Sequence, residues 1–157
     1  MKRKNEHFNG VLNINKPAGM TSHDVVDHIR KAAKMRRVGH TGTLDPMATG
    51  VLPLCLGKGT KLVQFLIAQD KEYIVDMKLR VVTDSQDMTG NLVEENPVPS
   101  IDASTIEKIF SQFRGEIMQI PPMISAKHHK GKRLYELARE GVEVERKPCK
   151  ITIHELR

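Results

Sequence analysis

Strand-type and helix-type patterns alternate along this chain of 157 residues, and the alternation restricts the folds that it can adopt. Residues 10–14 (GVLNI) and 51–56 (VLPLCL) are typical of short strands. Between them, Thr21 or Ser22 can cap a helix whose apolar side chains recur at helical spacing: Val25, Val26, Ile29 and Ala33. A further helical face follows the second strand and is formed by Leu62, Phe65 and Leu66. The pattern predicts the α/β fold class.

The second half of the chain continues this alternation. Residues 73–81 alternate apolar and charged side chains, which predicts a half-buried strand of an antiparallel or mixed sheet. Ser104 and Glu107 form a capping-box pattern ahead of a helical apolar face: Ile106, Ile109, Phe110 and Phe113. A short helix over residues 134–138 is expected to end at Gly141.

Composition narrows the protein class. Aromatic residues make up 4% of the chain and tryptophan is absent, so we expect an aliphatic core. No apolar run approaches the roughly 20 residues that span a bilayer, and no apolar segment follows the charged N-terminus. Cys55 and Cys149 are isolated, which indicates reduced thiols. We therefore expect a cytoplasmic protein with no membrane segment and no metal site.

Basic residues gather in two clusters on either side of an acidic middle, within a net charge of +6. The first cluster contains Lys31, Lys34, Arg36, Arg37 and His40, and the second contains Lys127, His128, His129, Lys130, Lys132 and Arg133. Such clusters suit a polyanion such as nucleic acid. The alternative is that each is a solvated face of an ordinary basic protein.

The most distinctive segment is residues 39–50, GHTGTLDPMATG, which lies between two apolar elements. Its glycines permit close approach of a ligand, and Pro46 fixes the backbone after Asp45. Asp45 is the one acid between Asp27 and Asp70, so it is a candidate catalytic carboxylate. Alternatively, Asp45 caps a turn through its side chain, as Asp-Pro pairs often do. The segment lacks the GxxxxGK[ST] pattern of a nucleotide-binding loop.

This loop resembles the active-site motif of the TruB family of pseudouridine synthases. Other segments are similar to further motifs of that family, in the family's order: GVLNINKPAGM, LGKGTKL, DKEYIV, TDSQDMTG, FRGEIMQIPPMISA and GKRLYELAREG. The resemblance extends over essentially residues 10–156. It implies the pseudouridine synthase fold, with a mixed or antiparallel sheet flanked by helices. The implied activity converts a uridine in the T-loop of tRNA, at position 55, to pseudouridine without metal, nucleotide or other cofactor.

The resemblance also assigns roles to particular residues. Asp45 becomes the catalytic carboxylate, and it could attack the ribose or the base, or deprotonate the sugar. Tyr73 matches a tyrosine that stacks on the flipped uracil, although its phase in the pattern also fits a core position. His40 matches a histidine that contacts the RNA loop, with a turn histidine as the alternative. Lys16 and Pro17 match a pair that supports the active-site loop.

The remaining basic candidates are expected to contact the T-stem-loop. Lys61 is expected near the RNA backbone, with a solvated lysine as the alternative. Lys130, Lys132 and Arg133 supply the second basic cluster.

We expect a basic tail over residues 1–9, followed over residues 10–157 by the N-terminal part of a catalytic domain. The closing strand pattern, residues 150–154, is followed by no turn, so we expect the sheet to be unfinished. Family members continue with further strands, an arginine that pairs with the aspartate, and usually a PUA domain. The alternative function is a non-catalytic RNA-binding module, or an inactive fragment that retains the basic surface.

Overall fold

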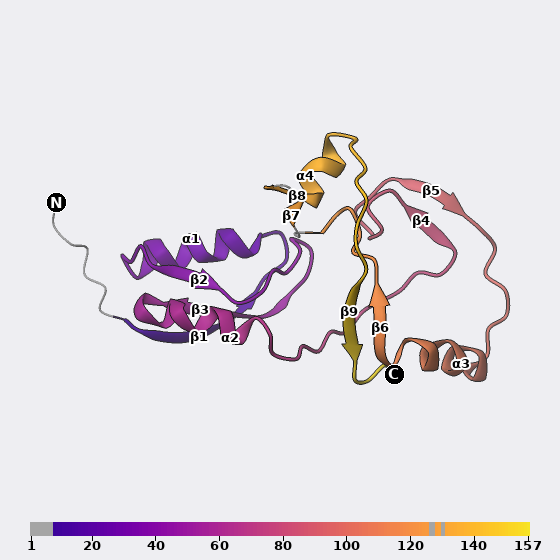
Figure 1. The fold of residues 1–157 in the computed structure, drawn as a ribbon, viewed down its shortest axis with the longest axis horizontal. Coiled ribbons are helices and arrows are strands. Elements are labelled where there is room, and N and C mark those ends of the chain that lie inside the picture. The colour runs from indigo at the N-terminus through magenta and orange to yellow at the C-terminus, as the bar shows by residue number, and fades with distance from the viewer. Residues whose placement is uncertain (1–7, 126–127, 130) are drawn as a thin grey trace. The chain divides into compact units, whose positions relative to one another are not determined.

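A computed structural model describes residues 8–125, 128–129 and 131–157. The chain divides into two compact units, Met1–Ile74 and Val75–Arg157, and each is described separately below. Both units combine antiparallel strands with helices (Figure 1). The predicted α/β class, with antiparallel sheet flanked by helices, is confirmed.

The first unit is built on a three-stranded sheet of strand order β1-β3-β2. Its strands are β1 (Gly10–Lys16), β2 (Val38–His40) and β3 (Gly50–Leu56), and both pairs are antiparallel. Ile14 of β1 lies opposite Leu52 of β3, so both side chains share one face of the sheet. The first two predicted strands are confirmed, whereas β2 had no sequence pattern long enough to predict it.

Helix α1 (Ser22–Ala32) covers that face. Thr21 is its N-cap and forms a reciprocal capping box with Asp24. The hydrogen bonds from Thr21 lower the pKa of the Asp24 carboxyl. The core beneath the helix is aliphatic, as predicted, and contains Val25, Val26, Met35, Val38, Leu52 and Leu54.

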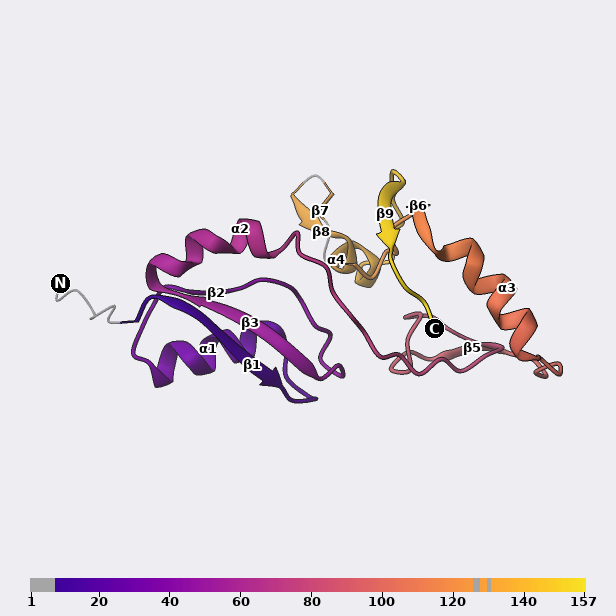
Figure 2. The same cartoon turned by 90° about the horizontal axis from the view of Figure 1, so that it is seen from below.

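The opposite face of the sheet is covered in part by the segment that follows β3. This segment consists of the 3₁₀ helix η1 (Gly57–Leu62) and the single turn α2 (Val63–Leu66), and Figure 2 shows α1 and α2 on opposite sides of the sheet. Cys55 is fully buried there, and burial raises the pKa of its thiol. The predicted inner position of Phe65 is wrong, because its side chain is 63% exposed. One turn of helix is too short to cover the face.

The second unit contains three two-stranded antiparallel sheets and two helices among its described residues. β4 pairs with β5, β6 with β9 and β7 with β8. Their bounds are β4 (Val81–Thr83), β5 (Leu92–Glu95), α3 (Ala103–Phe113), β6 (Gly115–Gln119), β7 (His128–His129), β8 (Lys132–Arg133), α4 (Leu134–Arg139) and β9 (Cys149–Ile153). The predicted closing strand is therefore confirmed as β9, and the predicted short helix as α4.

The strand predicted over residues 73–81 is not formed. Residues 71–78 are irregular, and regular strand structure begins at Val81. Ile74 is 98% exposed and Met77 74% exposed. A strand requires a neighbour to accept and donate its backbone hydrogen bonds, and the described residues supply none for this segment.

The capping box predicted for α3 is also wrong. The helix begins two residues earlier than the pattern suggested, and Asp102 is its N-cap, accepting the backbone amide of Thr105 at 2.8 Å. Glu107 instead pairs with Arg114, whose Nη2 lies 3.1 Å from the carboxylate. Aspartate and serine are equally good N-caps. The helix starts after Asp102 because the Asp102 carboxylate accepts the amide of Thr105, the third residue of the helix.

Candidate active site

The loop between β2 and β3 carries the candidate carboxylate. The amide of Thr41 donates to the carbonyl of Pro53 at 3.1 Å and attaches the start of the loop to β3. The amide of Ala48 donates to the carbonyl of Asp45 at 3.0 Å, which closes a tight turn over residues 45–48. Asp45 is thus the first residue of a hydrogen-bonded turn.

The residue before Asp45 is held by α1. The hydroxyl of Ser22 accepts the amide of Leu44 at 2.9 Å and donates to the carbonyl of the same residue at 3.2 Å. Ser22 is 2% exposed and is the first residue of the helix. The first residue of α1 therefore contacts the loop directly through its side chain.

The residue after Asp45 is held by the end of β1. The amide of Gly19 donates to the carbonyl of Pro46 at 2.8 Å, and Gly19 has a φ of +82°, which favours glycine. Lys16 is 0% exposed, and its ammonium donates to three backbone carbonyls: Pro17 at 3.0 Å, Met20 at 2.7 Å and Pro46 at 3.3 Å. With its ammonium enclosed by carbonyls, Lys16 supports the loop and does not present its charge to a phosphate.

The side chain of Asp45 itself is exposed. Among the residues that the structure describes, its carboxylate has no hydrogen-bond or ion-pair partner. The turn is closed by the backbone carbonyl of Asp45, so the alternative of a capping side chain is not realised. The structure thus fixes the backbone on both sides of a carboxylate that has no structural task of its own.

Two further candidates lie in the same unit. His40 ends β2, directly before the loop, and its Nδ1 is buried with no hydrogen-bond partner in the described part of the chain. Tyr73 is 62% exposed, in the irregular segment after α2, so the alternative core position is wrong. Lys71 of this segment lies beside the loop, since a Cβ built on Gly42 would lie 4.0 Å from Cε of Lys71.

The other basic candidates lie outside the loop and its immediate supports. Lys61 is exposed on η1, which begins at the end of β3 remote from the loop. Lys132 is in the second unit, where its ammonium lies 3.0 Å from the carboxylate of Glu140. Lys130 lies outside the described residues, and Arg133 is placed in β8 by its backbone alone.

Sequence reasoning missed the role of Ser22 and Gly19. Ser22 was only one of two candidate caps, and no pattern could show that its hydroxyl reaches a residue 22 positions later. The turn glycine after Lys16-Pro17 was visible, but its bond to Pro46 depends on the pairing of β1 with β3.

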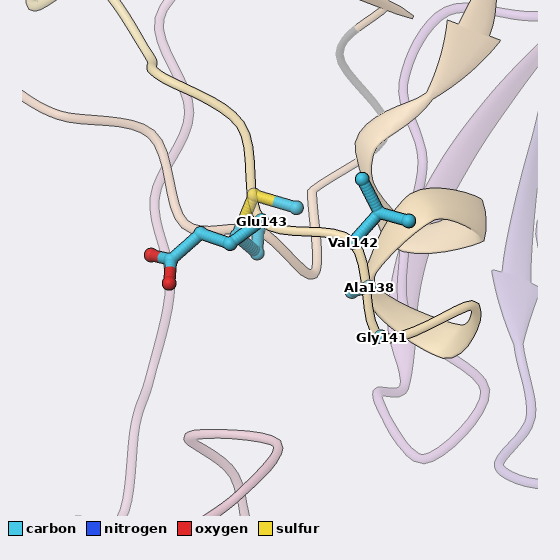
Figure 3. A pocket seen from close by; sticks show the side chains of 5 residues that line it. Ala138, Gly141, Val142 and Glu143 are labelled. Atoms are coloured by element: carbon cyan, nitrogen blue, oxygen red, sulfur yellow. The ribbon is translucent and has the colours of Figure 1, made fainter.

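The second unit contains an open apolar hollow. It is lined by Met123, Ala138, Gly141, Val142 and Glu143. Figure 3 shows the carboxylate of Glu143 extending away from Ala138 and Val142. Within the described ranges, no cluster of potential metal ligands is found and no helix is long and apolar enough to cross a membrane.

Comparison with known proteins identifies relatives over almost the whole chain. The family model for the N-terminal domain of TruB family pseudouridylate synthases matches residues 30–157. A tRNA pseudouridine synthase B of Caldanaerobacter subterraneus is 54% identical over 94% of this chain and 52% of its own length. Its counterpart in Francisella philomiragia is 47% identical over 99% of this chain and 52% of its own length. The chain thus spans about half the length of these curated relatives.

A solved structure shares the fold. One chain of a Cbf5-Nop10-Gar1 complex is similar with a TM-score of 0.51 and 31% sequence identity, over 76% of this chain and 31% of that chain.

Proposed function

The chain belongs to the TruB family of pseudouridylate synthases, and from this we propose that it is the N-terminal part of a catalytic domain that converts a tRNA uridine to pseudouridine. The proposed target is the uridine at position 55 in the T-loop, and the proposed setting is the cytoplasm. The reaction breaks the bond between C1′ of the ribose and N1 of the base and forms one from C1′ to C5. C5 loses its proton and N1 gains one, so the atoms balance and no oxidant, reductant or group donor is needed.

The observation that carries this proposal is the presentation of Asp45. Its carboxylate is exposed and unpartnered among the described residues, while hydrogen bonds hold the backbone of both neighbours. Catalysis by a carboxylate benefits from this arrangement, because a fixed backbone limits the positions that the reacting oxygen can occupy. The carboxylate then attacks the ribose or the base, or removes a proton from the sugar.

Access to the uridine requires that the base leave its stack. Base flipping costs a few kcal/mol, which stacking on an aromatic ring and contacts to phosphates can offset. We assign the stacking to Tyr73. Its ring is exposed, and Lys71, two residues earlier in the chain, lies beside Gly42 of the loop. His40 is assigned to the RNA loop, and the exposed basic residues to the phosphates.

One observation favours a second candidate, a non-catalytic RNA-binding module. No basic side chain of the described residues pairs with the carboxylate of Asp45, and an opposing cation is expected to orient a catalytic aspartate. In this alternative, the basic residues bind RNA and Asp45 performs no chemistry.

Replacement of Asp45 by asparagine distinguishes the two. Asp45→Asn in the full-length protein removes the charge but little volume. Pseudouridine formation should therefore be abolished, while the Kd for tRNA changes less than about threefold. Formation is measured by nucleotide analysis of a T-stem-loop RNA after incubation. The matched control is Asp27→Asn, which removes a carboxylate on α1 that pairs with Arg30. Activity of Asp45→Asn within tenfold of the unmodified protein would exclude a catalytic role.

A further inference from the structure

The hydroxyl of Ser22 bonds to both backbone groups of Leu44, the residue that precedes Asp45. A serine hydroxyl has one proton to donate and lone pairs to accept, so a single side chain satisfies an amide and a carbonyl at once. Ser22 is 2% exposed, and Thr41 and Lys16 are the other buried polar residues of this unit among those described. This buried hydroxyl is thus used on the loop and on no other segment.

The bond from Ser22 to the Leu44 carbonyl restrains the peptide plane before Asp45, and with it the direction of the Cα–Cβ bond of Asp45. Peptide units are planar, so the orientation of the Cα–Cβ bond of a residue is set once the peptide planes on both sides are fixed. The carbonyl of Leu44 belongs to the plane before Asp45 and is held by Ser22. The plane after Asp45 contains its own carbonyl, held by Ala48, and leads to the Pro46 carbonyl, held by Gly19 and Lys16. Ser22 therefore completes the restraint on the N-terminal side.

We propose that Ser22 is a positioning residue that orients the carboxylate of Asp45 for reaction, an inference that rests on the proposed function of Asp45. Ser22 is buried and bonds to the Leu44 backbone, so it would act through that backbone and not by direct contact with the RNA. Loss of the hydroxyl should lower kcat and leave KM unchanged. A misplacement of about 1 Å in a reacting group can reduce a rate about 100-fold.

A purely structural role for Ser22 would give a different result, and α1 offers the control. Asp24 forms the other arm of the capping box with Thr21 and stabilises the same end of the same helix without contacting the loop. Asp24→Ala therefore weakens the start of α1 and leaves both bonds to Leu44 in place. If Ser22 served only helix stability, the two variants would behave alike.

The test compares Ser22→Ala, Ser22→Thr and Asp24→Ala in the full-length protein. We expect Ser22→Ala to lower kcat for pseudouridine formation at least tenfold with KM within twofold, and Asp24→Ala to leave kcat within twofold. Ser22→Thr retains the hydroxyl and should recover most of the lost kcat. Hydrogen exchange of the Leu44 amide, followed by NMR, should accelerate at least tenfold in Ser22→Ala and much less in Asp24→Ala.

Two results would overturn the inference: a kcat of Ser22→Ala that matches that of Asp24→Ala, or an unchanged exchange rate at the Leu44 amide. Inactivity of the unmodified protein would instead contradict the proposed function. In that event, the exchange rates alone decide whether Ser22 fixes the segment that carries Asp45. The two failures are thus distinguishable.

Discussion

At the scale of single residues, Lys16 and Asp45 show opposite uses of a charged side chain. Lys16 is completely buried and donates to three carbonyls, whereas Asp45 is exposed without a partner among the described residues. Burial of a cation is costly unless hydrogen bonds compensate it. Here the compensating carbonyls belong to the turn after β1 and to Pro46, so a buried charge stabilises the conformation that presents an exposed one.

Replacement of Lys16 should therefore reduce stability. Lys16→Met keeps much of the volume but removes the ammonium donor from three carbonyls. The Pro46 carbonyl still accepts the amide of Gly19, whereas those of Pro17 and Met20 lose this donor, and a buried polar group without a partner costs about 1–3 kcal/mol. Because the cost of burying the ammonium also disappears, we expect a net loss of about 2 kcal/mol in the free energy of unfolding, measured by urea denaturation. The control Lys31→Met, at an exposed position of α1, should change it by less than about 0.5 kcal/mol. Equal changes in the free energy of unfolding for the two variants would contradict a stabilising role of the Lys16 hydrogen bonds.

Tyr73 should show the reverse behaviour. Its ring is 62% exposed, so Tyr73→Ala should change the free energy of unfolding by less than about 0.5 kcal/mol. Under the proposed stacking role, the same variant should lose at least tenfold in pseudouridine formation, whereas Tyr73→Phe should retain binding of the RNA. A large loss of stability in Tyr73→Ala would indicate that the ring packs against the protein.

At the scale of elements, the ends of the helices are fixed by side chains that compete for the same amides. At α3, Asp102 and Ser104 were both able to cap, and the Asp102 carboxylate accepts the Thr105 amide at 2.8 Å. Hydrogen bonds from the side chain and the amide of Thr105, and a further one from Ser104, lower the pKa of the Asp102 carboxyl. Capping therefore depends on the ionised form of Asp102.

We expect the stability of α3 to fall in acid for this reason. A carboxyl whose pKa is lowered by folding stabilises the fold above its ordinary pKa of about 4, and this contribution is lost as the pH falls through the lowered value. Asp102→Ala should therefore reduce helical content on heating at pH 7, more than Ser104→Ala does, and the difference from the unmodified chain should shrink below about pH 4. Circular dichroism measures it. A larger effect of Ser104→Ala would restore the cap that the sequence predicted.

At the scale of the whole molecule, charge and exposed apolar surface dominate. Lys31, Lys34, Arg36 and Arg37 have no ion-pair partner within the described residues, whereas Lys132 of the second cluster pairs with Glu140. Apolar side chains are also exposed in both units, among them Val51, Phe65, Ile109 and Phe113. The apolar face of α3 is thus partly exposed among the described residues.

Binding to a T-stem-loop should weaken steeply with salt, because neutralising each phosphate releases counterions. Replacing Lys31, Lys34, Arg36 and Arg37 by glutamine should flatten the plot of log affinity against log salt by about 0.7 for each phosphate that is no longer neutralised. Replacing Lys130, Lys132 and Arg133 should also flatten it, although Lys132 already pairs with Glu140. Unchanged slopes would identify both clusters as solvated faces.

The 157-residue chain on its own should self-associate and show no catalysis, while still binding RNA weakly. Exposed apolar faces favour association, and the described residues supply no cation opposite Asp45 to orient its carboxylate. Sedimentation at several concentrations and a T-loop assay test this. Exchanging Ile109 and Phe113 for lysine should reduce association and leave the first unit's core intact. Efficient turnover by a monomer would show that the site is complete.

The sequence by itself determined the segments whose pattern is local. The apolar spacing in α1 and the strand patterns of β1, β3 and β9 each required only neighbouring residues to be interpreted. The glycine-rich loop with Asp45 was also visible, because its composition is unlike that of the elements around it.

The tertiary structure alone decided what depends on residues far apart in the chain. The alternation in residues 73–81 was locally correct for a strand, but a strand forms only where a partner provides hydrogen bonds, and none is present among the described residues. The hydrogen bond between Ser22 and Leu44 joins residues that are 22 positions apart in the chain. The bond from Lys16 to Pro46 joins residues that are 30 positions apart. These contacts exist because β1 pairs with β3 and α1 packs on the sheet, so the orientation of Asp45 is a property of the folded unit and not of its motif.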